Sequence, residues 1–187
     1  MSHSDAELTV QKNRGGEVAG GLVGDNGGTI DSCYATGAVK KGSGSVGGLV
    51  GFNVGGGGQI LRSYATGAAG GTRRTSAGGL IGYNEGIVSD TYSTGAPSSR
   101  YGFKEGFVGD DVAQSGSIND SYWDTDTSGI TNLSQGAGNI ANDPGITGLT
   151  TAQFQSGLPA GFNPTVWAEN PNINGGLPYL LANPPPK

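Results

Sequence analysis

"GGLVGDNGGTIDSCYATG", residues 20–37, occurs three times in this chain with few changes. The second copy is "GGLVGFNVGGGGQILRSYATG", residues 47–67, and the third is "GGLIGYNEGIVSDTYSTG", residues 78–95. A degenerate fourth copy starts at "EGFVGDD", residues 105–111. A phrase that returns about every 30 residues is the signature of a repeat architecture rather than of a low-complexity tract.

Three columns of apolar side chains recur in the aligned copies. They are Leu22, Leu49, Leu80 and Phe107; Ile30, Ile60, Val88 and Ile118; and Tyr34, Tyr64, Tyr92 and Tyr122. The phrases are short, bounded by glycine and without helical periodicity, which indicates strands joined by tight corners. One such unit cannot bury its apolar side alone, whereas stacked units form a continuous core. The sequence therefore predicts an all-β parallel β-helix (β-solenoid) of about four coils, residues 1–129, with a C-terminal capping region and tail, residues 130–187.

The composition restricts the partners of this solenoid. Of 187 residues, 38 are glycine and 9 proline, a fraction that in other chains accompanies disorder. Charged residues make up only 13 % and the net charge is −5, so little self-repulsion opposes folding. The acidic balance argues against nucleic acid as a partner, since nucleic acid requires a basic face. No apolar stretch approaches the roughly 18–20 residues of a membrane span, so we expect no direct membrane insertion.

The four residues around each tyrosine predict which way its ring faces. Alternate residues of a strand share a face, so the residue before each tyrosine and the one after it lie together. These two columns are small until the last coil: Cys33, Ser63, Thr91 and Ser121; then Ala35, Ala65, Ser93 and Trp123. Small side chains suit a narrow interior, which makes Cys33 a buried small residue rather than a nucleophile. The tyrosines are then expected to face out or into a side groove; the opposite facing, with the rings stacked inside, stays open.

An outward tyrosine column has three interpretations. Its rings and the neighbouring threonines offer a platform for sugars, with stacking and hydrogen bonds. The candidate ligand-binding residues are Tyr34, Tyr64, Tyr92, Tyr122, Thr36, Thr66 and Thr94. Alternatively, the ring ladder only stabilises the stacking of coils. An ice-binding face is the third interpretation, weakened because the second column on that face is tyrosine rather than threonine.

The phrase "GGLVGxNxGxIxxSYATG" resembles the GLUG motif. This repeat occurs in large bacterial surface proteins such as filamentous-haemagglutinin-like exoproteins, and as an accessory region of some IgA-specific metallopeptidases. The resemblance is close over residues 20–95 and loose up to residue 129. It implies a secreted or surface-anchored bacterial β-solenoid, part of an adhesin, located outside the cell or on its surface. It implies no catalytic residues, because the motif is a scaffold in those families.

The two ends of the chain depart from the repeat. "TTAQFQSGLPAG" predicts a short helix with Thr150 as N-cap and an end at Gly157. The apolar residues beyond it are expected to cover the last coil, whose core and strand edges are otherwise exposed. They are Trp167, Leu177, Tyr179, Leu180 and Leu181. "LTVQKNRGGEV", residues 8–18, is expected to complete an earlier coil, and the start lacks a signal-peptide core, so an exported protein would be a fragment of a longer precursor.

Few residues suggest catalysis. His3 is the single histidine and lies near the start, which excludes a Ser/His/Asp triad and a "HExxH" zinc site. Paired carboxylates are the remaining route to an enzyme, with Asp90, Asp120 and Asp124 as candidates for acid and base roles on a polysaccharide. We expect no enzyme and no obligatory cofactor.

"DTDTSG", residues 124–129, echoes the first half of a calcium loop. Asp124, Asp126 and Ser128 stand at alternate positions and Gly129 follows, but the closing acid is replaced by Gln135. A weak calcium site is therefore one interpretation, and a hydrogen-bonded Asp turn is the other.

Together these observations predict a non-enzymatic, structural and adhesive module. It would be a rigid solenoid that presents a face to host or matrix glycans and proteins and stacks against neighbouring coils of a longer parent chain. Two rivals remain: a polysaccharide-acting β-helix enzyme, and a spacer without a ligand.

Overall fold

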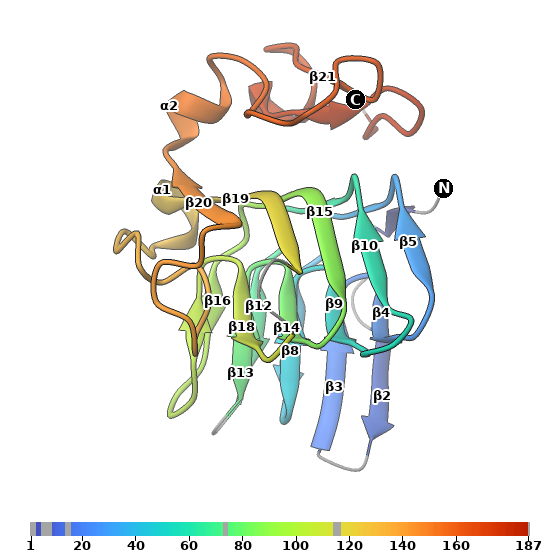
Figure 1. Cartoon of the computed structure of the whole chain (residues 1–187), viewed down its shortest axis with the longest axis vertical. Helices are drawn as coiled ribbons and strands as arrows, with labels where there is room; N and C mark the ends of the chain where they lie inside the picture. Colours follow the sequence, from blue (N-terminus) through green and yellow to red (C-terminus); the bar gives the residue numbers. More distant parts are fainter. Residues whose placement is uncertain (1–2, 5–8, 14–15, 73–74, 114–116, 187) are drawn as a thin grey trace.

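The repeated phrases stack as the coils of a β-solenoid of about four coils (Figure 1). In the computed structural model of the chain, residues 3–4, 9–13, 16–72, 75–113 and 117–186 are described. The first coil contains β3 (Gly16–Gly20), β4 (Val23–Asn26), β5 (Thr29–Asp31), β6 (Tyr34–Ala35) and β7 (Val39–Gly42). The second contains β8 (Ser45–Gly47), β9 (Val50–Asn53), β10 (Gln59–Leu61), β11 (Tyr64–Ala65) and β12 (Ala69–Gly71). The third contains β13 (Ser76–Gly78), β14 (Ile81–Asn84), β15 (Ile87–Ser93) and β16 (Pro97–Ser98), and the fourth contains β17 (Lys104–Glu105), β18 (Val108–Asp111) and β19 (Ile118–Asp124).

Equivalent residues of successive coils lie directly beside one another. Tyr64 pairs with Tyr34 on one side and with Tyr92 on the other, and Tyr92 pairs with Tyr122, all in parallel strands. The isoleucine column follows the same register, since Ile60 pairs with Ile30 and with Val88. The predicted stacking of the repeats is confirmed.

The interior of the solenoid is narrow and apolar. Leu49, Leu80 and Phe107 fill it together with the isoleucine column and with Ala35 and Ala65. Glycine is required where the coils touch: a Cβ on Gly48 would lie 2.2 Å from the carbonyl oxygen of Gly79. Cys33 is buried, as expected of a small interior residue.

A second buried row consists of three amides and one carboxyl group, at the ends of β4, β9, β14 and β18. The Nδ2 of Asn26 donates to Oδ1 of Asn53, Asn53 to Asn84, and Asn84 to Asp111, each at 2.8 Å. These four side chains are at most 6 % exposed. The row satisfies polar groups in the interior that would otherwise be costly to bury.

The first coil starts differently from the prediction. β1 (His3–Ser4) does pair in parallel with β6, ahead of the first full coil. However, β2 (Thr9–Asn13) forms an antiparallel pair with β3 rather than another parallel rung. The segment expected to complete an earlier coil therefore folds back on the coil that follows it.

The other end of the solenoid is closed by Trp123 and residues 130–149. Trp123 occupies the column that holds alanine or serine in the other coils, and its Nε1 donates to the carbonyl of Ile130 at 3.1 Å. Gly106 makes room for the indole, since a Cβ there would lie 2.2 Å from its Cδ1. β20 (Ile146–Leu149) then adds a further parallel rung beside β19. These contacts cover the end of the last coil, in place of the apolar residues near the C-terminus that the sequence predicted for this role.

Residues 150–186, here called the C-terminal strap, take a different course from the prediction. They contain α2 (Thr151–Phe154), β21 (Trp167–Ala168), a 3₁₀ turn (Asn174–Gly176) and β22 (Tyr179–Leu180). Thr150 caps α2 in a capping box with Gln153, as expected, although the helix ends at Phe154 instead of Gly157. In Figure 1 the strap, in orange and red, lies along the side of the solenoid above β19, β15, β10 and β5, rather than over the open end of the last coil. Asn183 near its end reaches the first coil, where its Nδ2 donates to Ser32 O at 3.3 Å.

Candidate functional site

The tyrosine column faces away from the solenoid interior, as the spacing predicted, but it is buried. The rings of Tyr34 and Tyr64 are stacked with centroids 5.0 Å apart, and those of Tyr64 and Tyr92 with centroids 4.9 Å apart. These three side chains are fully buried and Tyr122 is 7 % exposed. The strap covers them with Phe154, Phe162, Trp167 and Leu180, and together these residues form a second core.

Hydrogen bonds fix the strap on the tyrosines. The Tyr92 hydroxyl donates to the carbonyl of Pro178 at 2.6 Å and accepts from Nδ2 of Asn174. The Tyr122 hydroxyl donates to the carbonyl of Ala160 at 2.7 Å. Burial raises the pKa of Tyr92 well above its ordinary value, despite the hydrogen bond from Asn174. With the strap in place no ring face is open to a sugar, so the expected stacking platform is not present at this surface, and the interpretation of a structural ladder fits the contacts.

The threonine column beside the rings is stacked in register. The backbone N–H of Thr66 donates to Ala35 O, and that of Thr94 to Ala65 O, both at 2.9 Å. Thr36 and Thr66 are half-buried, whereas Thr94 is buried. Thr127 Oγ1 also donates to Thr94 O at 2.7 Å. A flat, exposed threonine face is therefore absent from this side of the described chain, and ligand binding by Thr36 and Thr66 stays a prediction.

The proposed calcium loop forms a capped helical turn. Asp124 is the N-cap of α1 (Thr125–Ser128), and its Oδ1 accepts from the backbone N–H groups of Asp126 and Thr127. Its Oδ2 accepts from Thr151 Oγ1 at 2.7 Å, and Asp126 accepts from the Thr151 N–H at 3.0 Å. Ser128 accepts from the N–H of Ile130. The contacts are those of a hydrogen-bonded Asp turn, and no group of three or more acidic, histidine or cysteine side chains in the described residues is arranged to hold a metal.

A row of polar residues lies at the corner just before the tyrosine strand. Ser32, Arg62, Asp90 and Asp120 occupy equivalent places in the four coils, and all have positive φ, between 43° and 55°. This conformation is uncommon for residues other than glycine, although Asp and Asn adopt it more readily than most. The corner row runs parallel to the tyrosine ladder, next to the strap.

Arg62 is held within the corner row by Asp31. Its Nε donates to Asp31 Oδ1 at 2.9 Å, and its Nη2 to Asp31 Oδ2. Burial disfavours the Asp31 carboxylate, but hydrogen bonds from Arg62 and Ser32 outweigh it and hold the pKa below its ordinary value. The hydrogen bond to Asp31 raises the pKa of Arg62, with a further contribution from the charge of Asp90. Both groups of the pair are thus charged at neutral pH.

A cavity of 290 Å³, here called the corner cavity, lies between the corner row and the strap. It is lined by Arg62, Asp90, Gly161, Asn163, Val166 and Trp167. It combines a cation, a carboxylate, an amide and an aromatic wall, the mixture that small-molecule sites use to fix a polar ligand. Trp167 is 1 % exposed, and its Nε1 has no hydrogen-bond partner among the described residues.

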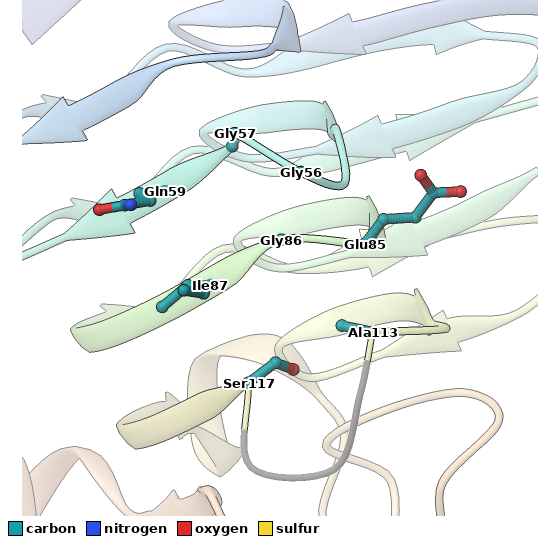
Figure 2. A pocket seen from close by; sticks show the side chains of 9 residues that line it. Gly56, Gly57, Gln59, Glu85, Gly86, Ile87, Ala113 and Ser117 are labelled. Atoms are coloured by element: carbon teal, nitrogen blue, oxygen red, sulfur yellow. The ribbon is translucent and has the colours of Figure 1, made fainter.

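A larger hollow of 390 Å³ runs across three coils at another corner. Figure 2 shows Gly56, Gly57 and Gln59 above Glu85, Gly86 and Ile87, with Ala113 and Ser117 below. Its floor is mainly glycine backbone, and Ile87 is 49 % exposed. Glu85 accepts a hydrogen bond from Gly55 N at 3.3 Å, and in Figure 2 its carboxylate extends away from the other labelled side chains. Because few polar side chains converge there, the corner cavity is the better candidate site.

No family model, curated protein or solved structure matches this chain. No helix in the described part of the chain has the length and apolar character needed to cross a bilayer. The corner cavity was not predicted from the sequence. The sequence identifies Asp90 only as a candidate carboxylate, and no signal in the repeats shows that Asn163 and Trp167 lie beside it.

Proposed function

We propose that this chain is a non-enzymatic, structural and adhesive module of a secreted or surface-anchored bacterial adhesin. It acts as a rigid solenoid that holds a binding face for host or matrix glycans or proteins at a fixed place. The resemblance of its repeats to the GLUG motif suggests this role, and the in-register stacking of the coils supports it.

One observation carries the proposal: equivalent residues of four coils are in register and are locked together on two faces. The apolar interior joins the coils from inside, and the strap joins them from outside through contacts from Ser32 in the first coil to Tyr122 in the fourth. A unit held in this way cannot bend between coils without disturbing both cores. Such stiffness suits a spacer that transmits force and holds a ligand away from a surface.

Burial excludes one of the candidate catalytic carboxylates of the alternative proposal, a polysaccharide-acting enzyme. Asp124 is fully buried, and both of its oxygens accept hydrogen bonds from the chain. It therefore presents no carboxyl to a substrate. Asp90 and Asp120 remain at the corner, one coil apart, and they are the pair on which a test of catalysis should be made.

A glycan array combined with a reducing-sugar assay tests the proposal. We expect the intact chain to bind at least one class of glycan and to release no reducing ends from it. Release of reducing ends that is lost in the Asp90→Asn variant would replace the proposal with the polysaccharide-acting enzyme. A blank array with an intact far-UV β spectrum would favour the spacer without a ligand.

A further inference from the structure

We propose that the corner cavity binds a single neutral sugar residue, and that it is the site by which this module holds a glycan. The inference rests on the proposed adhesive function and assigns it to particular side chains. It moves the site from the tyrosine rings, which the strap covers, to the edge of the strap itself.

Each polar side chain that lines the cavity is held in place by hydrogen bonds to other residues of the chain. These bonds use only some of its polar atoms. Arg62 uses Nε and Nη2 for Asp31. Asp90 uses Oδ2 to accept from Ser89 Oγ at 3.0 Å. Asn163 uses Oδ1 to accept from the N–H and the Oγ1 of Thr165, both at 2.9 Å.

The remaining atoms of these side chains have no partner among the described residues. They are Arg62 Nη1, Asp90 Oδ1 and Asn163 Nδ2, which provide a donor, an acceptor and a donor. Adjacent hydroxyls of a sugar ring both donate and accept, so they match such a set. Side chains that are positioned before the ligand arrives lose little further freedom on binding, which favours affinity.

Trp167 gives a second, independent indication of a ligand. It lines the cavity and is almost completely buried, yet its indole N–H is unpaired in the described structure. Buried polar groups in native proteins nearly always have a partner, so an unpaired one requires an explanation. Val166 and the indole provide apolar contact for the C–H face of a ring, and a ligand oxygen that reaches the indole N–H from the cavity would supply the missing acceptor.

Charge selects a neutral ligand over an acidic one. Arg62 is neutralised by Asp31, and Asp90 then leaves the cavity with a net charge of about −1. Asp120 lies just beyond it, because a Cβ on Gly161 would come within 2.5 Å of the Asp120 carboxyl carbon. A carboxylate-bearing sugar would therefore be repelled. The volume of 290 Å³ is at the lower end of small-molecule sites, roughly 300–1,000 Å³, and suits one ring rather than several.

The two tryptophans allow a direct test by ¹H–¹⁵N NMR of the full chain. Trp123, whose indole is bonded to Ile130, is the internal control for Trp167. The probes are glucose, galactose, mannose and N-acetylglucosamine, together with glucuronate and N-acetylneuraminate as acidic sugars. We expect at least one neutral sugar to shift the Trp167 indole signal saturably, to leave Trp123 unchanged, and to bind more tightly than either acidic sugar.

Two nearly isosteric variants test the contacts. Asp90→Asn keeps the side-chain shape, and Asn tolerates the positive φ of this corner. Asn163→Asp keeps the oxygen that Thr165 needs and removes the amide donor. We expect Asp90→Asn to weaken the binding of the neutral sugar about tenfold or more, as is typical for the loss of a hydrogen bond to a charged group. Asn163→Asp should weaken it about threefold or more, because the donor that it removes is neutral. Asp110→Asn, on β18 and outside the cavity, is the matched control and should bind like the parent chain.

The results of these experiments distinguish a failure of the proposed sugar site from a failure of the proposed adhesive function. The assignment of the sugar site to the corner cavity is wrong in any of three cases. No sugar shifts the Trp167 indole signal, acidic sugars shift it as strongly as neutral ones, or the shift is unchanged in both variants. If a glycan array of the same sample is positive in that case, the adhesive function stands and its site lies elsewhere. If the array is also blank, the proposed function fails together with the site.

Discussion

Two cores lie on opposite sides of one strand, β11. Ala65 faces the solenoid interior, where small and aliphatic side chains of equivalent repeats meet. Tyr64 faces the strap, where repeated rings meet Trp167 and other residues of a segment without repeats. The interior core is built by the repeats alone, whereas the outer core depends on a partner that the repeats do not encode. The comparison shows that one repeated phrase can serve two packing purposes at once.

The largest expected effect is on the outer core. Tyr64→Ala removes a fully buried ring from the centre of the ladder, between Tyr34 and Tyr92. Large aromatic-to-alanine changes in a core cost about 3–5 kcal/mol, because they leave a cavity that the structure cannot fill. We expect a loss of this size in the free energy of unfolding, measured by urea denaturation.

Tyr101→Ala is the matched control, because Tyr101 is 62 % exposed. It should change stability by no more than about 0.5 kcal/mol. A loss for Tyr64→Ala as small as that of the control would mean that the strap is only loosely attached and that the outer core contributes little.

The next largest effect is expected in the solenoid interior, where there is little free space for a larger side chain. Ala65→Leu inserts three carbons at a place where an added Cβ on Gly48 would already lie 3.0 Å from Ala65 Cβ. Overpacking of a filled core costs about 1–3 kcal/mol. We expect a destabilisation of that size and a weaker near-UV signal from Trp123, which closes the same interior column.

Ala68→Leu is the matched control, because it introduces the same side chain at an exposed position of the same coil. It should be close to neutral. Equal effects of the two substitutions would show that the interior column can widen, contrary to the close approach of the coils.

The interior could be predicted from the sequence because its partners are copies of one another. Once the tyrosines, isoleucines and leucines are aligned, the register of the coils follows, and the small residues beside each tyrosine indicate the inner face. The buried row of three amides and Asp111 also has a signal in the sequence, because "GDN", "GFN", "GYN" and "GDD" occur at equivalent places in the four copies.

The outer core and the corner cavity could not be predicted in the same way. The strap has no period, so nothing in its sequence distinguishes a cover for the last coil from a cover for the side. Phe162 and Trp167 stand among turn residues, and their packing against Tyr92 depends on the path of the whole strap. The cavity combines one residue from each of two coils with residues about 70 or more positions further along the chain, and an alignment of repeats cannot show such contacts.

The last coil differs from the other three in that it places a titratable side chain, Glu105, in the interior part of the repeat. Glu105 takes the place of Gly20, Gly47 and Gly78 in the paired strands, and it is 6 % exposed. Burial raises its pKa from 4.5 to about 7, and the nearby charge of Lys104 opposes the shift only in part. The folded chain therefore keeps this proton over a pH range in which the unfolded chain has lost it. Stability from this group is present below about pH 4.5 and is lost as the pH rises through about 7.

We therefore expect Glu105→Gln, which remains neutral, to raise Tm relative to the parent chain at pH 8 and to do so less at pH 5. Thermal unfolding at the two pH values measures this difference directly. A difference in Tm that does not change with pH would contradict the assignment of the raised pKa to Glu105.

The smallest effect is expected from the ion pair at the corner. The side chains of Arg62 and Asp31 are 35 % and 39 % exposed, so solvent screens their attraction. A double-mutant cycle of Arg62→Met and Asp31→Asn should give a coupling of about 0.2–1 kcal/mol, which decreases with added salt. Because the pKa of Asp31 is lowered in the folded chain, the coupling is present above about pH 4 and is lost as the pH falls further. A coupling as large as the cost of Tyr64→Ala would show that the corner row, rather than the ring ladder, holds this side of the solenoid together, so the cycle ranks the two outer features against each other.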